Sequence, residues 1–222
     1  MVQTTWHAGS VMTQHHLEID DLRITLEDAP LLELDAHIGP GEVLAVMGPS
    51  GSGKSTLLAW LAGFLTPDFQ ASGRILLDGR DITLLPAERR GIGLLFQDPL
   101  LFPHLSVAGN LRFGIPRAIP DKLERAEAAL KQVGLSGFGH RDPATLSGGQ
   151  KARVALMRLL LSEPRAVLLD EPFSRLDIHL RQEMRQLVFD RLYEAGLPSL
   201  LVTHDREDAE AAGGPIIDLT GQ

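Results

Sequence analysis

One segment, residues 48–56 with the sequence GPSGSGKST, constrains the fold more than any other part of the chain. It matches the pattern G-x-x-x-x-G-K-[ST], in which glycines let backbone amides curl around phosphate oxygens. An apolar run at 43–47 precedes it and an apolar segment at 57–65 follows it. This is the strand–loop–helix context that a P-loop requires. The alternative is a glycine-rich turn that binds nothing.

We therefore expect a nucleotide's phosphates to bind at Gly48, Pro49, Ser50, Gly51, Ser52, Gly53, Lys54, Ser55 and Thr56. In such loops the lysine, here Lys54, brings a point charge to the β- and γ-phosphates, and the hydroxyl of Ser55 can bind Mg²⁺. The start of the following helix adds the positive end of a dipole.

Composition narrows the function classes. The chain has 222 residues and a net charge of −8, which weighs against a nucleic-acid binder because those are more often basic. It has no cysteine, so disulfides and thiolate metal sites are excluded. The apolar segment at 55–67 is shorter than the about 20 helical residues that span a bilayer. We expect residues 1–14 to be a disordered leader.

Alternation of apolar and polar residues predicts two strands of an antiparallel sheet, at 17–26 and 32–38. Another strand is predicted at 74–77, opened by Ser72 and Gly73 and closed by a hairpin-type turn at Asp78 and Gly79.

The region after residue 98 is broken up by Pro99, Pro103, Pro116 and Pro120, and we expect it to be a helical insertion. Its clearest helix is predicted at 121–133, with Asp121 as the N-cap and Gly134 after the end. The residues expected on its buried face are Leu123, Ala126, Leu130 and Val133.

Ser147 and Gln150 are three residues apart at the start of another predicted helix, the spacing of a capping box. Gly148 and Gly149 lie between them. Two interpretations stay open from these residues alone: a well-capped helix, or an anion site built from the exposed amides of a helix N-terminus.

Acidic and imidazole side chains follow two apolar runs that we expect to be buried parallel strands. The run at 166–169 ends in Asp170 and Glu171, and the run at 199–202 leads to His204. Ligands bind at the carboxyl ends of strands in open α/β sheets. Neighbouring side chains of a strand point in opposite directions, so the two carboxylates should have different tasks.

Taken in order, these pieces resemble the nucleotide-binding subunit of ABC transporters over about residues 15–220. Residues 48–56 match Walker A, Gln97 the Q-loop, 146–150 (LSGGQ) the family signature, 167–171 Walker B, 174–177 the D-loop and His204 the switch histidine. The segment 97–107 is similar to the importer branch. The resemblance implies an ABC-ATPase fold: a RecA-like parallel-sheet core, an antiparallel β subdomain and a helical subdomain inserted at about 98–160, within one domain over 15–222.

The resemblance also implies ATP and Mg²⁺ as ligands. Glu171, His204 and Gln97 become the expected catalytic residues, and Ser55, Gln97 and Asp170 the expected metal ligands. In this family the signature helix binds the γ-phosphate held by the opposite subunit. The residues expected to act on the partner's nucleotide are Ser147, Gly148, Gly149, Gln150 and Asp177.

The implied function is ATP hydrolysis that powers solute import. The implied partners are a second copy of the chain in an ATP-dependent homodimer, an integral membrane permease that docks at 97–107, and a solute-binding protein, with no nucleic acid. The expected location is the cytoplasmic face of the bacterial inner membrane, peripherally bound. The alternatives are the ATPase of an ABC exporter, or a soluble ABC ATPase that acts on nucleic acid.

Three departures from the family pattern bear on function. The strand near Thr25, where the family usually has an aromatic residue that stacks on adenine, has Ile24, Thr25 and Leu26 instead. Arg175 stands where the D-loop usually has alanine. We also expect no C-terminal regulatory domain of the maltose type after Gln222. A kinase or GTPase would lack LSGGQ, and a GTPase would have the motif N-K-x-D, which this sequence does not contain.

Overall fold

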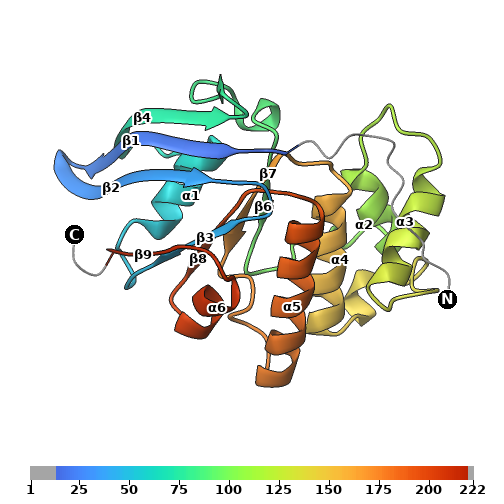
Figure 1. The fold of residues 1–222 in the computed structure, drawn as a ribbon. Helices are drawn as coiled ribbons and strands as arrows, with labels where there is room; N and C mark the ends of the chain where they lie inside the picture. Colours follow the sequence, from blue (N-terminus) through green and yellow to red (C-terminus); the bar gives the residue numbers. More distant parts are fainter. Residues whose placement is uncertain (1–13, 220–222) are drawn as a thin grey trace.

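A computed structural model describes residues 14–219, so all but one residue of the predicted leader lie outside the described part. At the centre is a five-stranded parallel sheet with the order β6-β7-β8-β3-β9 (Figure 1). Its strands are β3 (Val43–Met47), β6 (Ile92–Leu95), β7 (Ala166–Asp170), β8 (Ser199–Thr203) and β9 (Ile216–Asp218). The buried parallel strands predicted at 166–169 and 199–202 are confirmed as β7 and β8.

A second, antiparallel sheet has the order β2-β1-β4-β5. It consists of β1 (Leu17–Leu26), β2 (Ala29–Ile38), β4 (Phe69–Leu77) and the short β5 (Arg80–Asp81). The predicted hairpin turn is confirmed, because Asp78 and Gly79 have φ values of 54° and 74°.

The predicted start of β4 is wrong, because the strand begins at Phe69 and Gly73 lies inside it. The pairing of β1 with β4 shifts register between Asp20 and Arg23, which makes a bulge opposite Gly73. A Cβ atom on Gly73 would lie 2.7 Å from the carbonyl oxygen of Asp21. Glycine here therefore marks the close approach of two backbones inside a strand rather than a strand end.

Helix α1 (Lys54–Ala62) lies between the two sheets, and α4 (Gly148–Leu160), α5 (Ile178–Glu194) and α6 (Arg206–Ala211) cover the other face of the parallel sheet (Figure 1). Side chains alternate accordingly along the strands. Leu44 and Val46 of β3 pack in the core with α1, whereas Val43 and Ala45 pack with α5.

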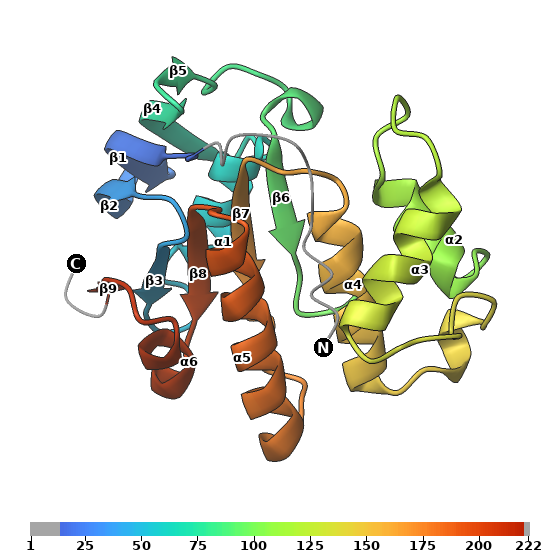
Figure 2. The same ribbon diagram turned by 45° about the vertical axis from the view of Figure 1, so that its right-hand side comes forward.

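The remaining helices, α2 (Val107–Gly114) and α3 (Lys122–Gln132), pack against α4 away from both sheets (Figure 2). Short 3-10 turns, η1 (Ala87–Arg89) and η2 (Pro143–Thr145), lie in the connections. The helix predicted at 121–133 is confirmed in position, but two details are wrong. Leu123 is 55% exposed, since the helix buries Ala126, Ala129 and Leu130 instead. Asp121 precedes the helix in a left-handed conformation and makes no side-chain capping bond.

Arg90 holds the end of α1 on the side away from the P-loop. One guanidinium nitrogen donates to the carbonyl oxygens of Trp60 and Leu61 at 2.7 and 2.9 Å, and the others donate to Leu85 and Thr83. Burial lowers the pKa of Arg90, while the four carbonyl acceptors satisfy its donors. Between residues 14 and 219 no helix is both long enough and apolar enough to cross a membrane.

Candidate functional site

Four adjacent strands of the parallel sheet end at the same edge, and each is followed by predicted site residues. The P-loop follows β3, His204 follows β8, Glu171 follows β7, and Gln97 comes two residues after β6. These residues are up to 156 positions apart in the sequence (204 − 48), and the strand order β6-β7-β8-β3 makes their strands neighbours. This is the edge at which ligands bind in open α/β sheets.

The P-loop has the shape of an anion cradle. Gly51 and Gly53 both have φ values of 86°, a left-handed conformation that glycine adopts without strain. Lys54 is buried, and its Nζ atom donates to the carbonyl oxygens of Gly48 and Pro49, both at 2.7 Å. The buried hydroxyl of Ser52 has no hydrogen-bond partner within the described residues. A buried hydroxyl aimed into a glycine-rich loop, beside a lysine, suits a ligand with several acceptor oxygens.

The N-terminus of α1 faces this loop. Its N-cap is Gly53, and within the described chain no side chain caps it. Ser55, in the first turn, is exposed and Thr56 is half-buried. The first turn therefore offers free amides and one hydroxyl to a bound phosphate or to its metal ion.

Asp170 and Glu171 sit next to each other but in different surroundings. Burial raises the pKa of Asp170, the charge of Glu171 raises it further, and the charge of Lys54 opposes both effects. Glu171 has a φ of 44°, which is uncommon outside glycine. Its carbonyl oxygen accepts bonds from the backbone amide and the hydroxyl of Ser174 at 3.2 and 2.9 Å.

Glu171 and His204 meet across the ends of β7 and β8. The Nδ1 atom of His204 lies 3.0 Å from Oε1 of Glu171, although the residues are 33 positions apart. The histidine side chain is 62% exposed and the carboxylate 26%. The pair is thus held together while its outer side stays open to a ligand.

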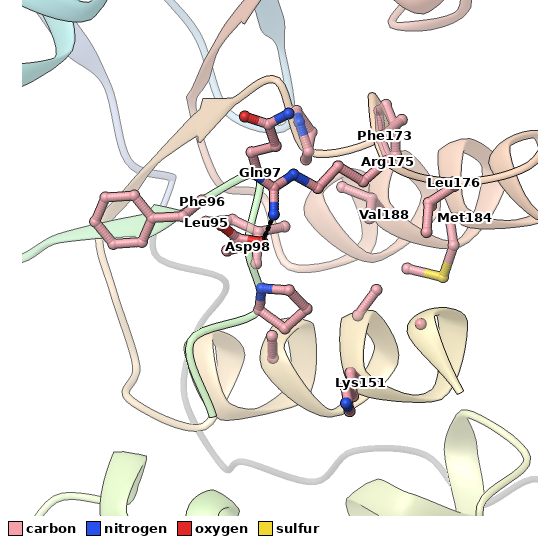
Figure 3. A pocket seen from close by; sticks show the side chains of 15 residues that line it. Leu95, Phe96, Gln97, Asp98, Lys151, Phe173, Arg175, Leu176, Met184 and Val188 are labelled. Carbon is pink, nitrogen blue, oxygen red and sulfur yellow. Dashed lines mark hydrogen bonds and ion pairs between the residues drawn. The ribbon is translucent and has the colours of Figure 1, made fainter. Parts of the chain in front are cut away.

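Gln97 borders a cavity of about 180 Å³ between the Q-loop, α4 and the D-loop (Figure 3). The cavity wall is largely apolar, with Leu95, Phe173 and Met184 among its residues, and none of them belongs to the P-loop. At its mouth Arg175 of the D-loop forms an ion pair with Asp98. Sequence reasoning missed this pair.

The N-terminus of α4 has the predicted capping box. The hydroxyl of Ser147 accepts a bond from the amide of Gln150 at 3.3 Å, and the side chain of Gln150 accepts one from the amide of Ser147 at 3.0 Å. Ser147 and Gly148 are exposed, while Gly149 is buried against Leu180. Among described residues no acceptor is bonded to the amides of Gly148 and Gly149. The two interpretations left open by the sequence, a well-capped helix and an anion site, are therefore compatible with each other, because the helix is capped and still has free amides.

Asp177 caps α5, since its carboxylate accepts a bond from the amide of Leu180 at 3.0 Å. The residue is exposed. Its capping role was not predicted.

Sequence reasoning also missed Arg181, which donates to two D-loop carbonyls and pairs with Asp205 beside His204. The available signal was weak: arginines at 181 and 185, one turn apart on an amphipathic helix, followed by acidic residues at 205, 207 and 208.

The sequence pattern that defines the ABC transporter family matches residues 31–174. This stretch includes the P-loop, Gln97, the signature and Asp170 with Glu171. The chain belongs to the ABC transporter family. As the ATP-binding subunit of that family it is an ATPase, which confirms the predicted fold class and activity.

Curated relatives of this ABC ATPase include an ATP-binding protein of similar length and longer ATP-binding proteins named for import. It is 44% identical over 196 residues to the uncharacterized ABC transporter ATP-binding protein YnjD of Escherichia coli, covering 87% of this chain and 90% of that one. It is 45% identical over 188 residues to the Fe(3+) ions import ATP-binding protein FbpC of Agrobacterium fabrum, covering 83% and 52%. It is 46% identical over 193 residues to the spermidine/putrescine import ATP-binding protein PotA of Protochlamydia amoebophila, covering 85% and 51%. The chain thus spans about half the length of FbpC and PotA.

Proposed function

We propose that this ABC ATPase powers a solute importer and works as an ATP-dependent head-to-tail homodimer. The observation that carries the proposal is the contact of Glu171 with His204 at the strand edge that also bears the P-loop. Relatives whose names include import support the direction of transport.

In this proposal the P-loop amides and Lys54 hold the phosphates, and Glu171 orients and polarises the attacking water. His204, held by Glu171, contacts the γ-phosphate. Little covalent chemistry is required of the protein, so catalysis consists of positioning and charge stabilisation. The side chain of Glu171 is 26% exposed and therefore open to a water molecule, whereas burial and the charge of Glu171 both raise the pKa of Asp170, which suits it to a supporting task.

The residues also fit Mg²⁺, which prefers hard oxygen ligands and is usually held by one or two carboxylates together with substrate phosphates. Ser55 and Gln97 would bind it directly and Asp170 through water. When bound, the ion neutralises phosphate charge.

The second half of the site comes from a partner copy in this proposal. Ser147, Gly148, Gly149 and Gln150 present a helix N-terminus with free amides, yet the P-loop of the same chain already provides an anion cradle. A second cradle is useful if it closes on the nucleotide of another subunit, with Asp177 at the same interface.

A membrane permease is the proposed partner at segment 97–107. An open cavity of about 420 Å³ lies there, between the end of β6, α2 and α4. Phe96, Leu100 and Phe113 line it and are 39%, 56% and 67% exposed. Exposed apolar residues grouped around a cavity are typical of an interaction site.

The proposal includes a solute-binding protein in the complex and a peripheral position at the cytoplasmic face of the membrane. It keeps a single domain over 15–222 with a helical subdomain at about 98–160.

Glu171→Gln tests the proposal, because glutamine keeps the size and polarity but cannot act as a base. ATP hydrolysis by the purified protein should fall by about 10²–10⁴-fold, while ATP binding survives. The control is Glu88→Gln, an exposed glutamate in η1, which should hydrolyse ATP like the wild type. Unchanged turnover in the Glu171 variant would remove Glu171 from the mechanism.

A further inference from the structure

Arg181 links the two segments that carry Glu171 and His204. It is the fourth residue of α5, and its Nε atom donates to the carbonyl oxygen of Phe173 at 3.2 Å. One terminal nitrogen donates to the carbonyl of Ser174 at 3.4 Å, and the other pairs with the carboxylate of Asp205. A single guanidinium therefore bonds to the turn after β7 and to the loop after β8.

The first of these segments shapes the backbone of Glu171. Residues 171–174 form a turn in which the carbonyl of Glu171 accepts from Ser174, and Arg181 donates to the carbonyls of Phe173 and Ser174 in the same turn. Because Glu171 has an uncommon positive φ, its conformation persists only if the surroundings hold it. Arg181 is part of those surroundings.

The second segment is fixed at Asp205, the residue next to His204. The amide of Asp205 donates to the hydroxyl of Thr203 at 3.0 Å, and its carboxylate accepts from the amide of Glu207 at 2.8 Å. Asp205 is thus the N-cap of α6 as well as the partner of Arg181. Moving Asp205 would move the backbone that carries His204.

These bonds close a ring: Glu171 to His204, His204 along the chain to Asp205, Asp205 to Arg181, and Arg181 back to the turn that begins at Glu171. The charged members are well shielded, with 23% of the Arg181 side chain and 25% of the Asp205 side chain exposed. Shielded, multiply bonded ion pairs hold geometry better than exposed pairs, which solvent and salt weaken.

We propose that Arg181 is a positioning residue that fixes Glu171 and His204 relative to each other by tying the D-loop turn to the loop after β8. The bonds of Arg181 run to Phe173, Ser174 and Asp205, and among the described residues it makes no hydrogen bond or ion pair with the P-loop or the signature. The inference rests on the proposed roles of Glu171 and His204 and adds a residue that governs their geometry. Its effect should therefore appear in the rate of hydrolysis rather than in nucleotide binding.

The test uses steady-state ATP hydrolysis by the purified full chain. Arg181→Ala should lower kcat by about tenfold to a hundredfold, because a displacement near 1 Å has effects of that size. The ATP concentration for half-maximal rate should change by less than about threefold, since the phosphate cradle is untouched. Arg181→Lys should recover part of the rate, because an ammonium can still pair with Asp205 but cannot bridge both segments.

Asp205→Asn separates the ion pair from the helix cap, since asparagine caps helices as well as aspartate does. It should lower kcat less than Arg181→Ala, and it should add little further loss once Arg181 is alanine, because the remaining ion pair of Asp205, with Arg185 at 3.8 Å, is longer than its pair with Arg181 at 2.5 Å. Arg191→Ala is the matched control: Arg191 lies on the same helix and its ion-pair partner is Glu194 within that helix. It should leave kcat and half-saturation unchanged.

An unchanged kcat in folded Arg181→Ala or Arg181→Lys protein overturns the inference, and so do losses from Arg181→Ala and Asp205→Asn that multiply in the double variant. A raised half-saturation with normal kcat also overturns it. Glu171→Gln, measured alongside, separates the two proposals. If that variant loses hydrolysis and the Arg181 variants do not, only the positioning role fails; if it retains hydrolysis, the proposed mechanism fails and the positioning role with it.

Discussion

Arg175 in the D-loop forms an ion pair with Asp98, the residue that directly follows Gln97 (Figure 3). The pair crosses the mouth of the cavity between the Q-loop and the D-loop, two segments 77 positions apart. Both side chains are largely exposed, 59% for Arg175 and 49% for Asp98. The bond is therefore open to water and to salt.

Because of that exposure, Arg175→Ala should lower the free energy of unfolding by less than about 1 kcal/mol, and the difference should shrink in high salt. The buried pair Arg185–Asp208, with 9% and 2% of the side chains exposed, gives the contrast. Arg185→Ala leaves a buried carboxylate unpaired and should lower the free energy of unfolding by about 3–5 kcal/mol. Urea denaturation of both variants measures this, and equal losses would contradict the exposure argument.

The protein should discriminate only weakly between ATP and GTP. In β1, Ile24 is buried in the core and Thr25 is half-buried, so neither offers an aromatic surface for adenine, and Trp6 lies outside the described residues. In a competition assay ATP should be preferred over GTP by less than about a hundredfold, or roughly 2.7 kcal/mol. Thr25→Tyr should strengthen ATP binding, because base–aromatic stacking contributes about 1–3 kcal/mol. A stronger native preference for ATP means that another residue provides the contact.

The dimer should depend on the γ-phosphate. Without nucleotide we expect mainly monomer, since −8 charges on each chain disfavour close approach. Glu171→Gln with ATP and Mg²⁺ should be dimeric by light scattering, and with ADP monomeric. Adding Ser147→Arg should return it to monomer by filling the cradle at α4.

Ser147→Arg also removes the cap of α4, which contributes about 1 kcal/mol, so the fold should persist. The matched control is Ser136→Arg, at an exposed position in the loop after α3. It should leave the ATP-dependent dimer intact. A dimer that survives Ser147→Arg would mean that α4 does not bind the partner's nucleotide.

Asp78 should make stability depend on pH at the acid end. Burial raises its pKa, but bonds from the amide of His16, the ring of His15 and the guanidinium of Arg165 outweigh burial, so the pKa lies below its usual value. Such a group stabilises the fold above its unfolded pKa of about 3.9, and the stabilisation is lost as the pH falls through the lower folded pKa.

Asp78→Asn tests this, because asparagine tolerates the left-handed conformation of this turn. The variant should be less stable than the wild type in urea unfolding at neutral pH, and the difference should shrink below about pH 4. A difference that stays constant in acid would assign the loss to packing rather than to charge.

Much of the site could be predicted because its signals are local. The P-loop pattern, the capping box at Ser147 and the apolar runs before Glu171 and His204 each lie within a few residues. The strand order then follows from the fold that these segments specify together, and the structure places all of them at one edge.

Contacts between distant segments could not be predicted in this way. Arg181 forms an ion pair with Asp205, which lies 24 positions further along the chain. Arg90 donates to the end of α1, which lies about 30 positions earlier. In the sequence both arginines look like solvated surface residues. The error at Leu123 has a similar cause: periodicity placed it on the apolar face of its helix, but the packing surface of α3 is centred on Ala126, Ala129 and Leu130 and does not cover the first turn.

The bonds of Arg90 to the last turn of α1 have a mechanical consequence. Helix α1 is packed between the two sheets, and the buried guanidinium of Arg90 bonds to the carbonyls of Trp60 and Leu61 at its carboxyl end. The helix cannot slide along its axis without breaking both of these charge-assisted bonds. We therefore expect the P-loop at the other end of α1 to keep its position when nucleotide binds. Rearrangements that follow nucleotide binding are then expected in the elements on the opposite side of the sheet, which would move relative to a fixed α1.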